Sequence, residues 1–218
     1  MELEVSTVVV GPFQQNCRIV KDKATGEAVI VDPGDEAERI LATVKQVGAR
    51  VRYVLLTRAH LDHAGAAAPV KRALGVPLAM HPDDRPILEA LPQHGAMFGL
   101  SDLEVPEVDI DLSETTRLPF ADGEIEVVHT PGHTPGGVTF LFGRHGFFGD
   151  TLFQMSVGRT DLGGDAKTYA QTLREKVLAM PDDTVVYTGH GPDTTIGQER
   201  ANNPFLNGQI RMDDPTWS

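Results

Sequence analysis

Apolar residues recur along the chain with two different periods, which predict strands and helices in turn. Runs rich in β-branched residues predict six strands, at residues 6–10, 28–32, 51–57, 125–129, 138–142 and 184–188. Apolar residues at helical spacing predict one helix that ends near Gly48 and another that ends near Gly75. A third helix is expected after Asp165, a suitable N-cap, with a core face formed by Tyr169, Leu173, Val177 and Met180.

The order of these elements predicts the fold class. Strands alternate with helices at both ends of the chain, whereas residues 125–150 show strands joined by short Gly/Pro turns. This mixture is typical of an α/β protein with two sheets covered by helices. We find no repeat and no long linker, so we expect one domain over residues 1–218. Residues 91–119 have weak periodicity, which predicts an irregular excursion that either walls a substrate cleft or is a plain surface loop.

Composition narrows the classes of partner. With 19 basic against 31 acidic residues the formal charge is −12, which disfavours nucleic acid and anionic membrane surfaces. We find neither a secretory leader nor a run of about 20 apolar residues, so we expect a cytoplasmic protein that is a monomer or a small homo-oligomer. Cys17 is the only cysteine, and a buried apolar role is expected for it rather than a nucleophilic one.

The strongest local signal follows the apolar residues 54–56. His60, Asp62 and His63 fall within four positions where the predicted strand ends. Imidazole and carboxylate are preferred ligands of Zn²⁺ and related divalent metals, and a turn at a strand end can bring them to one point. The segment therefore predicts a metal site.

Three further segments each add one ligand-type residue at a strand end or in a tight turn. His133 lies among the prolines and glycines of residues 130–137, Asp150 follows the apolar run 146–149, and His190 stands between two glycines. Four separate segments that end in such residues are hard to explain as chance. The other histidines are expected to have no ligand role, although one of them, His129, could orient a ligand; they are His81, His94, His129 and His145.

The order of these six residues resembles the metallo-β-lactamase superfamily over essentially the whole chain. Shorter motifs look like its short bacterial glyoxalase II-like (hydroxyacylglutathione hydrolase-like) branch, and they lie at residues 31–34, 149–153, 158–161, 189–192, 196–200 and 203–205. The resemblance implies a four-layer αβ/βα sandwich with metal ions at one edge of the paired sheets.

The same resemblance implies a ligand set. His60 and His133 would hold a first metal, Asp150 would bridge, and the second metal would take Asp62, His63 and His190. Zinc is the expected ion, as one or two ions, with iron or manganese as alternatives. The remaining first-metal ligand should stand at position 58, which is an arginine here. A guanidinium stays protonated and offers no lone pair to a metal.

Three interpretations of Arg58 remain open. The first metal persists on His60, His133, Asp150 and water. Alternatively the guanidinium replaces that ion, leaves one metal on the other ligands and itself stabilises an oxyanion. In the last interpretation the substitution, natural or engineered, has removed activity. We favour the mononuclear interpretation.

The resemblance implies a metal-dependent hydrolase, specifically a thioesterase that cleaves S-acylglutathione substrates of the S-lactoylglutathione type. A metal-bound hydroxide would attack the thioester carbonyl, and Asp62 would be both a ligand and the anchor of the attacking water. The larger glyoxalase II enzymes bind glutathione largely through a helical C-terminal domain, which we do not expect here.

Two other hypotheses are a persulfide dioxygenase-like iron protein, which Arg58 disfavours because a ligand of that branch stands at this position, and a metal-poor, non-catalytic member. A β-lactamase proper is disfavoured by the thioesterase-like motifs.

Overall fold

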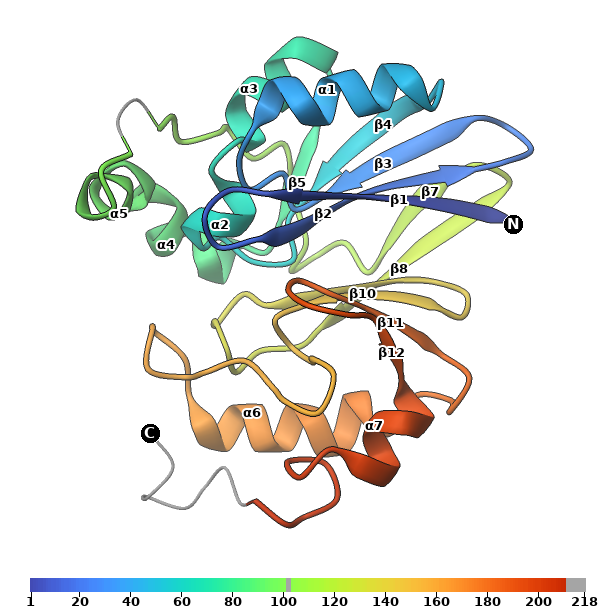
Figure 1. The fold of residues 1–218 in the computed structure, drawn as a ribbon, viewed down its shortest axis with the longest axis vertical. Coiled ribbons are helices and arrows are strands. Elements are labelled where there is room, and N and C mark those ends of the chain that lie inside the picture. The colour runs from blue at the N-terminus through green and yellow to red at the C-terminus, as the bar shows by residue number, and fades with distance from the viewer. Residues whose placement is uncertain (101–102, 211–218) are drawn as a thin grey trace.

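Two six-stranded sheets lie face to face, and helices cover the outer side of each, so that the chain forms four layers (Figure 1). The structure is a computed structural model that describes residues 1–100 and 103–210. This arrangement confirms the predicted αβ/βα sandwich. Among the described residues, none of the helices combines the length and the apolar character needed to cross a membrane.

The first sheet is mixed, with β1 to β3 antiparallel and β3 to β6 parallel. Its strands lie side by side in sequence order: β1 Leu3–Val10, β2 Gln15–Asp22, β3 Glu27–Val31, β4 Arg50–Leu55, β5 Leu78–Met80 and β6 Ile110–Asp111.

In the second sheet every neighbouring pair is antiparallel except β10 and β11, which are parallel. Its strands, in spatial order, are β12 Thr194–Thr195, β11 Val185–Thr188, β10 His145–Gly149, β9 Val138–Phe142, β8 Gly123–His129 and β7 Arg117–Phe120.

The helices fall into three groups (Figure 1). On the outer face of the first sheet lie α1 Ala37–Gln46 and α3 Ala67–Leu74. The outer face of the second carries α6 Ala166–Thr172, its π-helical continuation η2 Leu173–Val177, and α7 Ile196–Asn202. The short helices connect the first sheet to the site: α2 Leu61–Ala64, the 3₁₀ turn η1 Pro82–Asp84, α4 Arg85–Glu89 and α5 Leu91–Met97.

Three clusters of buried apolar side chains fill the spaces between the four layers. Strand alternation divides them, because successive side chains point to opposite faces of a sheet. Val54 packs outward with Ile40 of α1, whereas Leu55 packs inward with Phe140 of the second sheet. Tyr169 belongs to the third cluster, beneath the second sheet.

The predicted helix ends are confirmed. Gly75 ends α3 with a left-handed φ of 64°, and Gly48, with a φ of 62°, follows the end of α1. The side chain of Asp165 accepts a hydrogen bond from the backbone N–H of Thr168 at 2.7 Å and caps α6.

The prediction of an irregular excursion over residues 91–119 is wrong in part. This stretch contains α5, β6 and the start of β7. Their signals are weak because α5 has only seven residues, of which Leu91 and Gly95 are buried, and β6 has only two. Strand β2 had not been predicted either. It buries polar residues such as Arg18, which pairs with Asp193 at 2.5 Å.

Candidate metal centre

The loop after β4 brings three ligand-type side chains to the edge of the sheets. His60 is the N-cap of α2, and Asp62 and His63 lie in its single turn. The loop around Gly34 packs directly on this turn, since a Cβ built on Gly34 would lie 1.6 Å from the carbonyl oxygen of Asp62. Only glycine permits this close approach.

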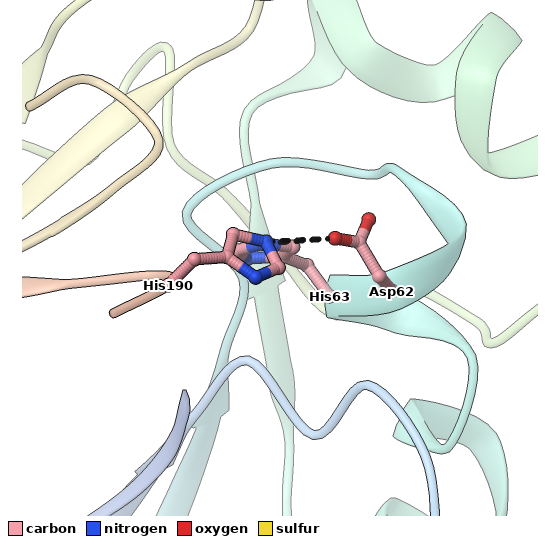
Figure 2. A group of neighbouring side chains, drawn as sticks. All are labelled: Asp62, His63 and His190. Atoms are coloured by element: carbon pink, nitrogen blue, oxygen red, sulfur yellow. Dashed lines mark hydrogen bonds and ion pairs between the residues drawn. The ribbon is translucent and has the colours of Figure 1, made fainter. Parts of the chain in front are cut away.

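One group of donor atoms comes from α2 and the loop after β11. His190 reaches Asp62 and His63 from that separate loop (Figure 2). Its Nε2 lies 2.9 Å from Asp62 Oδ2 and 3.4 Å from His63 Nε2, and the latter two atoms are 3.6 Å apart. Asp150 Oδ1 completes the group, 3.4 Å from His63 Nε2 and 3.7 Å from His190 Nε2.

These separations match one divalent ion. Donor atoms about 2.0–2.1 Å from a tetrahedral zinc lie about 3.3 Å from one another. The measured separations, from 2.9 to 3.7 Å, fall around this value. The four side chains therefore have the spacing and the chemistry of a zinc-type site.

A second group adjoins the first through Asp150. His60 Nδ1 lies 3.1 Å from His133 Nε2, which is 3.8 Å from Asp150 Oδ2. Asp150 thus directs one carboxylate oxygen to each group. The structure therefore brings all six residues named from the sequence together.

Arg58 lies between the two groups. Its Nε donates to His60 Nδ1 at 3.0 Å, and its Nη1 lies 2.7 Å from Asp150 Oδ1 and in contact with His63 Nε2. Its Nη2 lies 3.3 Å from Asp62 Oδ1. With the side chain 5% exposed, the guanidinium is a buried cation that touches four of the six donor residues.

The positive charge of Arg58 shifts the pKa values of the neighbouring side chains. Burial would raise the pKa of the Asp62 and Asp150 carboxyls, but the Arg58 cation and other positive neighbours hold both well below their ordinary values. Burial and Arg58 together lower the pKa of His60 to about 3 and that of His133 to about 4. Both imidazoles are therefore neutral at pH 7 and can donate a lone pair.

Opposing effects act on the pKa of His63. Burial and Arg58 lower its pKa, whereas the carboxylates of Asp62, Asp32 and Asp150 raise it to about 9. A proton and an N–H of Arg58 thus compete for the same atom, Nε2. A divalent ion among Asp62, His63, Asp150 and His190 fits this donor set once the guanidinium withdraws from Nε2. Asp150 Oδ1 is consistent with such an ion, because the cation now beside it is Arg58 Nη1 at 2.7 Å and withdrawal of the guanidinium would free this buried oxygen to bind the ion.

Asp32 contacts the donor cluster through His63, and the sequence placed it only within the predicted strand 28–32 and the motif 31–34. It follows β3 with a left-handed φ of 53°, and its carboxylate accepts hydrogen bonds from Thr57 N at 2.7 Å and Thr57 Oγ1 at 2.6 Å. It also accepts from His63 Nδ1 at 2.8 Å. A carboxylate directly after a strand, before Pro33, was the available signal.

Asp84 joins the loop that carries His60 to the loop that carries His133. No pattern in the sequence pointed to it. This fully buried carboxylate accepts from Ala59 N at 3.0 Å, from Thr134 Oγ1 at 2.9 Å and from Gly136 N at 2.6 Å. Ala59 precedes His60, and the other two flank the turn after His133. Asp84 therefore fixes the distance between these loops.

Tyr169 supports the bridging carboxylate. Its buried hydroxyl lies 2.8 Å from the carbonyl oxygens of both Asp150 and Thr151 and accepts from Gly158 N at 2.9 Å. The core role predicted for this residue is confirmed, and the hydroxyl also holds the segment that carries Asp150.

A second set of ligand-type residues comprises His81, Asp83 and His129. The two imidazole rings are stacked, with centroids 4.1 Å apart and planes 9° apart. Imidazole lone pairs lie in the ring plane, so two parallel rings cannot direct them at one ion. His129 Nε2 donates instead to the carbonyl of Pro135 at 2.9 Å. That His81 and His129 are not ligands stays a prediction, and the stacking of their rings is the observation in its favour.

The fold and the donor cluster define the class of protein. The model of the metallo-beta-lactamase superfamily matches residues 10–190, and the chain belongs to this superfamily of metal-binding proteins.

Hydroxyacylglutathione hydrolase GloC of Haemophilus influenzae is 38% identical over 210 residues, which cover 94% of this chain and 99% of that protein. The human mitochondrial persulfide dioxygenase ETHE1 is more distant, at 30% identity over 86% of this chain and 70% of its own.

Two solved structures show the same fold at similar identity. The crystal structure of the BLEG-1 B3 metallo-beta-lactamase has a TM-score of 0.87 and 37% identity, and covers 94% of this chain and 100% of that one. The crystal structure of TTHA1623 in a di-iron-bound form has a TM-score of 0.83 and 39% identity, and covers 93% of this chain and 100% of that one.

Proposed function

We propose that this chain is a metal-dependent thioester hydrolase that holds one divalent ion on Asp62, His63, Asp150 and His190. The observation that carries the proposal is the set of donor separations close to those of a tetrahedral ion. Zinc suits this mixture of imidazole and carboxylate, and iron or manganese are the alternatives.

The likeness to hydroxyacylglutathione hydrolase GloC supports the choice of substrate, because nearly the whole of both chains aligns. We therefore propose a small S-acylglutathione, of the S-lactoylglutathione type, as the substrate class.

The bound ion would lower the pKa of a water molecule to about 7 and polarise the thioester carbonyl. Asp62 would orient the attacking water through its carboxylate, of which Oδ2 lies 2.9 Å from His190 Nε2. His190 is itself held by a hydrogen bond between its Nδ1 and the carbonyl of Phe13 at 3.0 Å. A thiolate leaves readily, so no strong general acid is required.

Arg58 has a distinct role in this proposal. Its Nη1 pairs with Asp150 Oδ1 and contacts His63 Nε2, two atoms assigned to the ion, so the guanidinium would have to shift toward His60 for the ion to bind. A fixed cation beside the reacting carbonyl stabilises the negative charge that develops on oxygen. We propose that Arg58 takes the place of a first metal. Its guanidinium would be positioned by His60, which accepts from Arg58 Nε and lies 3.1 Å from His133 Nε2.

The test is metal content and activity of the protein and of Arg58→His. We expect about one tightly bound ion per chain in the parent, two in Arg58→His, and hydrolysis of S-lactoylglutathione by the parent. Arg52→His, an exposed position, is the matched control and should leave the metal content unchanged. Two equally tight ions in both proteins would refute the mononuclear proposal, and the absence of any bound ion would favour a non-catalytic member.

Two relatives suggest competing activities that the same preparation can test. The likeness to persulfide dioxygenase ETHE1 calls for an oxygen-uptake assay with glutathione persulfide after iron loading. The likeness to BLEG-1 calls for a β-lactam assay. The contact of Arg58 Nε with His60 Nδ1 counts against the dioxygenase, because it engages a neighbouring candidate ligand. Turnover in either assay without thioester hydrolysis would replace our proposal.

A further inference from the structure

A small pocket of about 140 Å³ opens beside Asp62. The turn between β1 and β2 forms one wall, the start of α2 forms the second, and residues that follow α5 form the third. Its lining residues are Val10, Gly11, Pro12, Phe13, Gly34, Asp35, Leu61, Asp62, Leu100 and Leu103. Leu100 and Leu103 belong to residues 91–119, for which the sequence left open a cleft wall or a plain surface loop.

The pocket shares one residue with the donor cluster. Asp62 belongs to both, and the turn that carries Phe13 also accepts the hydrogen bond from His190 Nδ1. The ring of Phe13 packs edge-on against Phe98, with centroids 5.2 Å apart. Both rings are exposed, at 41% and 59%, so an apolar rim extends outward from the pocket.

The lining selects by polarity and by charge. Among the described residues of the lining, most side chains are aliphatic or aromatic, and the charged ones are Asp35 and Asp62. An anionic group that entered this space would meet Asp35 and, in the part of the lining that the structure describes, no cation. A neutral, apolar group therefore suits it best.

The volume sets the size of that group. A dry, apolar cavity of about 150 Å³ accommodates a benzene molecule, which has six carbons. The three-carbon lactoyl group would leave much of this pocket unfilled, whereas an acyl chain of about six carbons would fill it.

We propose that this pocket binds the acyl group of the thioester substrate and selects neutral, apolar acyl groups of about six carbons. The inference rests on the proposed thioesterase function, since it places the thioester carbonyl beside Asp62 and the acyl chain against Leu61, Leu100 and Leu103. Asp35 is then a specificity-determining residue that excludes acyl groups ending in a carboxylate.

The first experiment measures kcat/KM for acylglutathiones with straight acyl chains of two to ten carbons. We expect a rise of about fourfold per methylene, the value of burying one CH₂ group, with a maximum near six carbons. Leu103→Ala should move the maximum to longer chains. The kcat/KM for hexanoylglutathione should exceed that for adipoylglutathione by at least tenfold, and Asp35→Asn should reduce this ratio of kcat/KM values. Glu36→Gln, at the exposed neighbouring position, is the matched control and should preserve it.

A second experiment separates this inference from the proposed function. Calorimetry with S-methyl-, S-butyl- and S-hexylglutathione, thioethers that cannot be hydrolysed, measures the pocket without turnover. Affinity that rises with chain length in the parent, and less in a pocket-filling Leu103→Trp variant, supports the pocket even if no thioester is hydrolysed. Hydrolysis with equal kcat/KM for all chain lengths, or thioether affinity independent of chain length, overturns the pocket and leaves the thioesterase proposal standing.

Discussion

His63 Nδ1 donates a hydrogen bond to Asp32 Oδ2 at 2.8 Å, and this contact leaves Nε2 as the ring atom that faces the donor cluster. A carboxylate accepts only, so the direction of the hydrogen bond is fixed. Partners of this kind set the tautomer and orientation of a metal-binding imidazole and increase its basicity. Asp32 thereby links the end of β3 to the proposed metal site.

Asp32→Asn tests this link. We expect a ten- to hundredfold loss of zinc affinity, because the amide holds His63 Nδ1–H less strongly than the carboxylate does. Competition with a chelator of known affinity measures the change. Asp122→Asn, at an exposed position in the turn between β7 and β8, should bind zinc as the parent does. Equal affinities for Asp32→Asn and the parent would show that the contact does not support metal binding.

Asp84→Asn tests the connection between the two ligand loops. The amide can accept from fewer of the three donors that Asp84 satisfies, so the free energy of unfolding should fall by about 1–3 kcal/mol. Urea denaturation of the metal-free protein measures it. The exposed neighbour offers the control Asp83→Asn, for which a change below about 0.5 kcal/mol is expected. A loss of equal size in both variants would contradict the role assigned to Asp84.

Gln15→Met should stabilise the protein. Both polar atoms of the buried Gln15 amide lack a hydrogen-bond partner among the described residues, and such a group costs about 1–3 kcal/mol. Methionine has a similar shape without the polar atoms. Thermal denaturation should show a higher midpoint for Gln15→Met and no shift for the exposed Gln46→Met. A lower midpoint for Gln15→Met would show that the amide has a partner that stabilises it.

Cys17 should make stability depend on pH above the neutral range. Burial, aided by the charge of Asp32, raises the pKa of this thiol in the folded protein. The unfolded thiol ionises near its ordinary pKa of about 8.5, so the contribution is complete below that pH and declines by about 1.4 kcal/mol per pH unit above it. The difference in unfolding free energy between the parent and Cys17→Ala, measured from pH 7 to 10, gives this slope. A constant difference would mean that the thiol ionises equally in both states.

Much of the fold could be predicted because the strands of the sandwich interior show their pattern directly. The predicted run 138–142 coincides with β9, and 28–32 differs from β3 by one residue at each end. Strand β2 was missed because Arg18 lies in it as a buried charge, and its partner Asp193 is 175 residues away. No local pattern reports a partner at that distance.

The candidate site shows the same division. The six donor residues could be found because each closes a recognisable segment, and the geometry brings them together. Asp84 could not be found, because its three hydrogen-bond donors lie on two other loops. The position of the Arg58 guanidinium between the donor groups also depends on packing that the sequence does not display.

The donor cluster draws on both sheets, and this has a consequence for how the chain assembles. Asp62 and His63 follow a strand of the first sheet, whereas Asp150 and His190 follow strands of the second. A cut in the segment between β6 and β7 would yield two fragments, neither of which carries the full donor set. Zinc would then bridge the two fragments. The amount of zinc bound after the fragments are mixed would therefore measure the fraction that has associated.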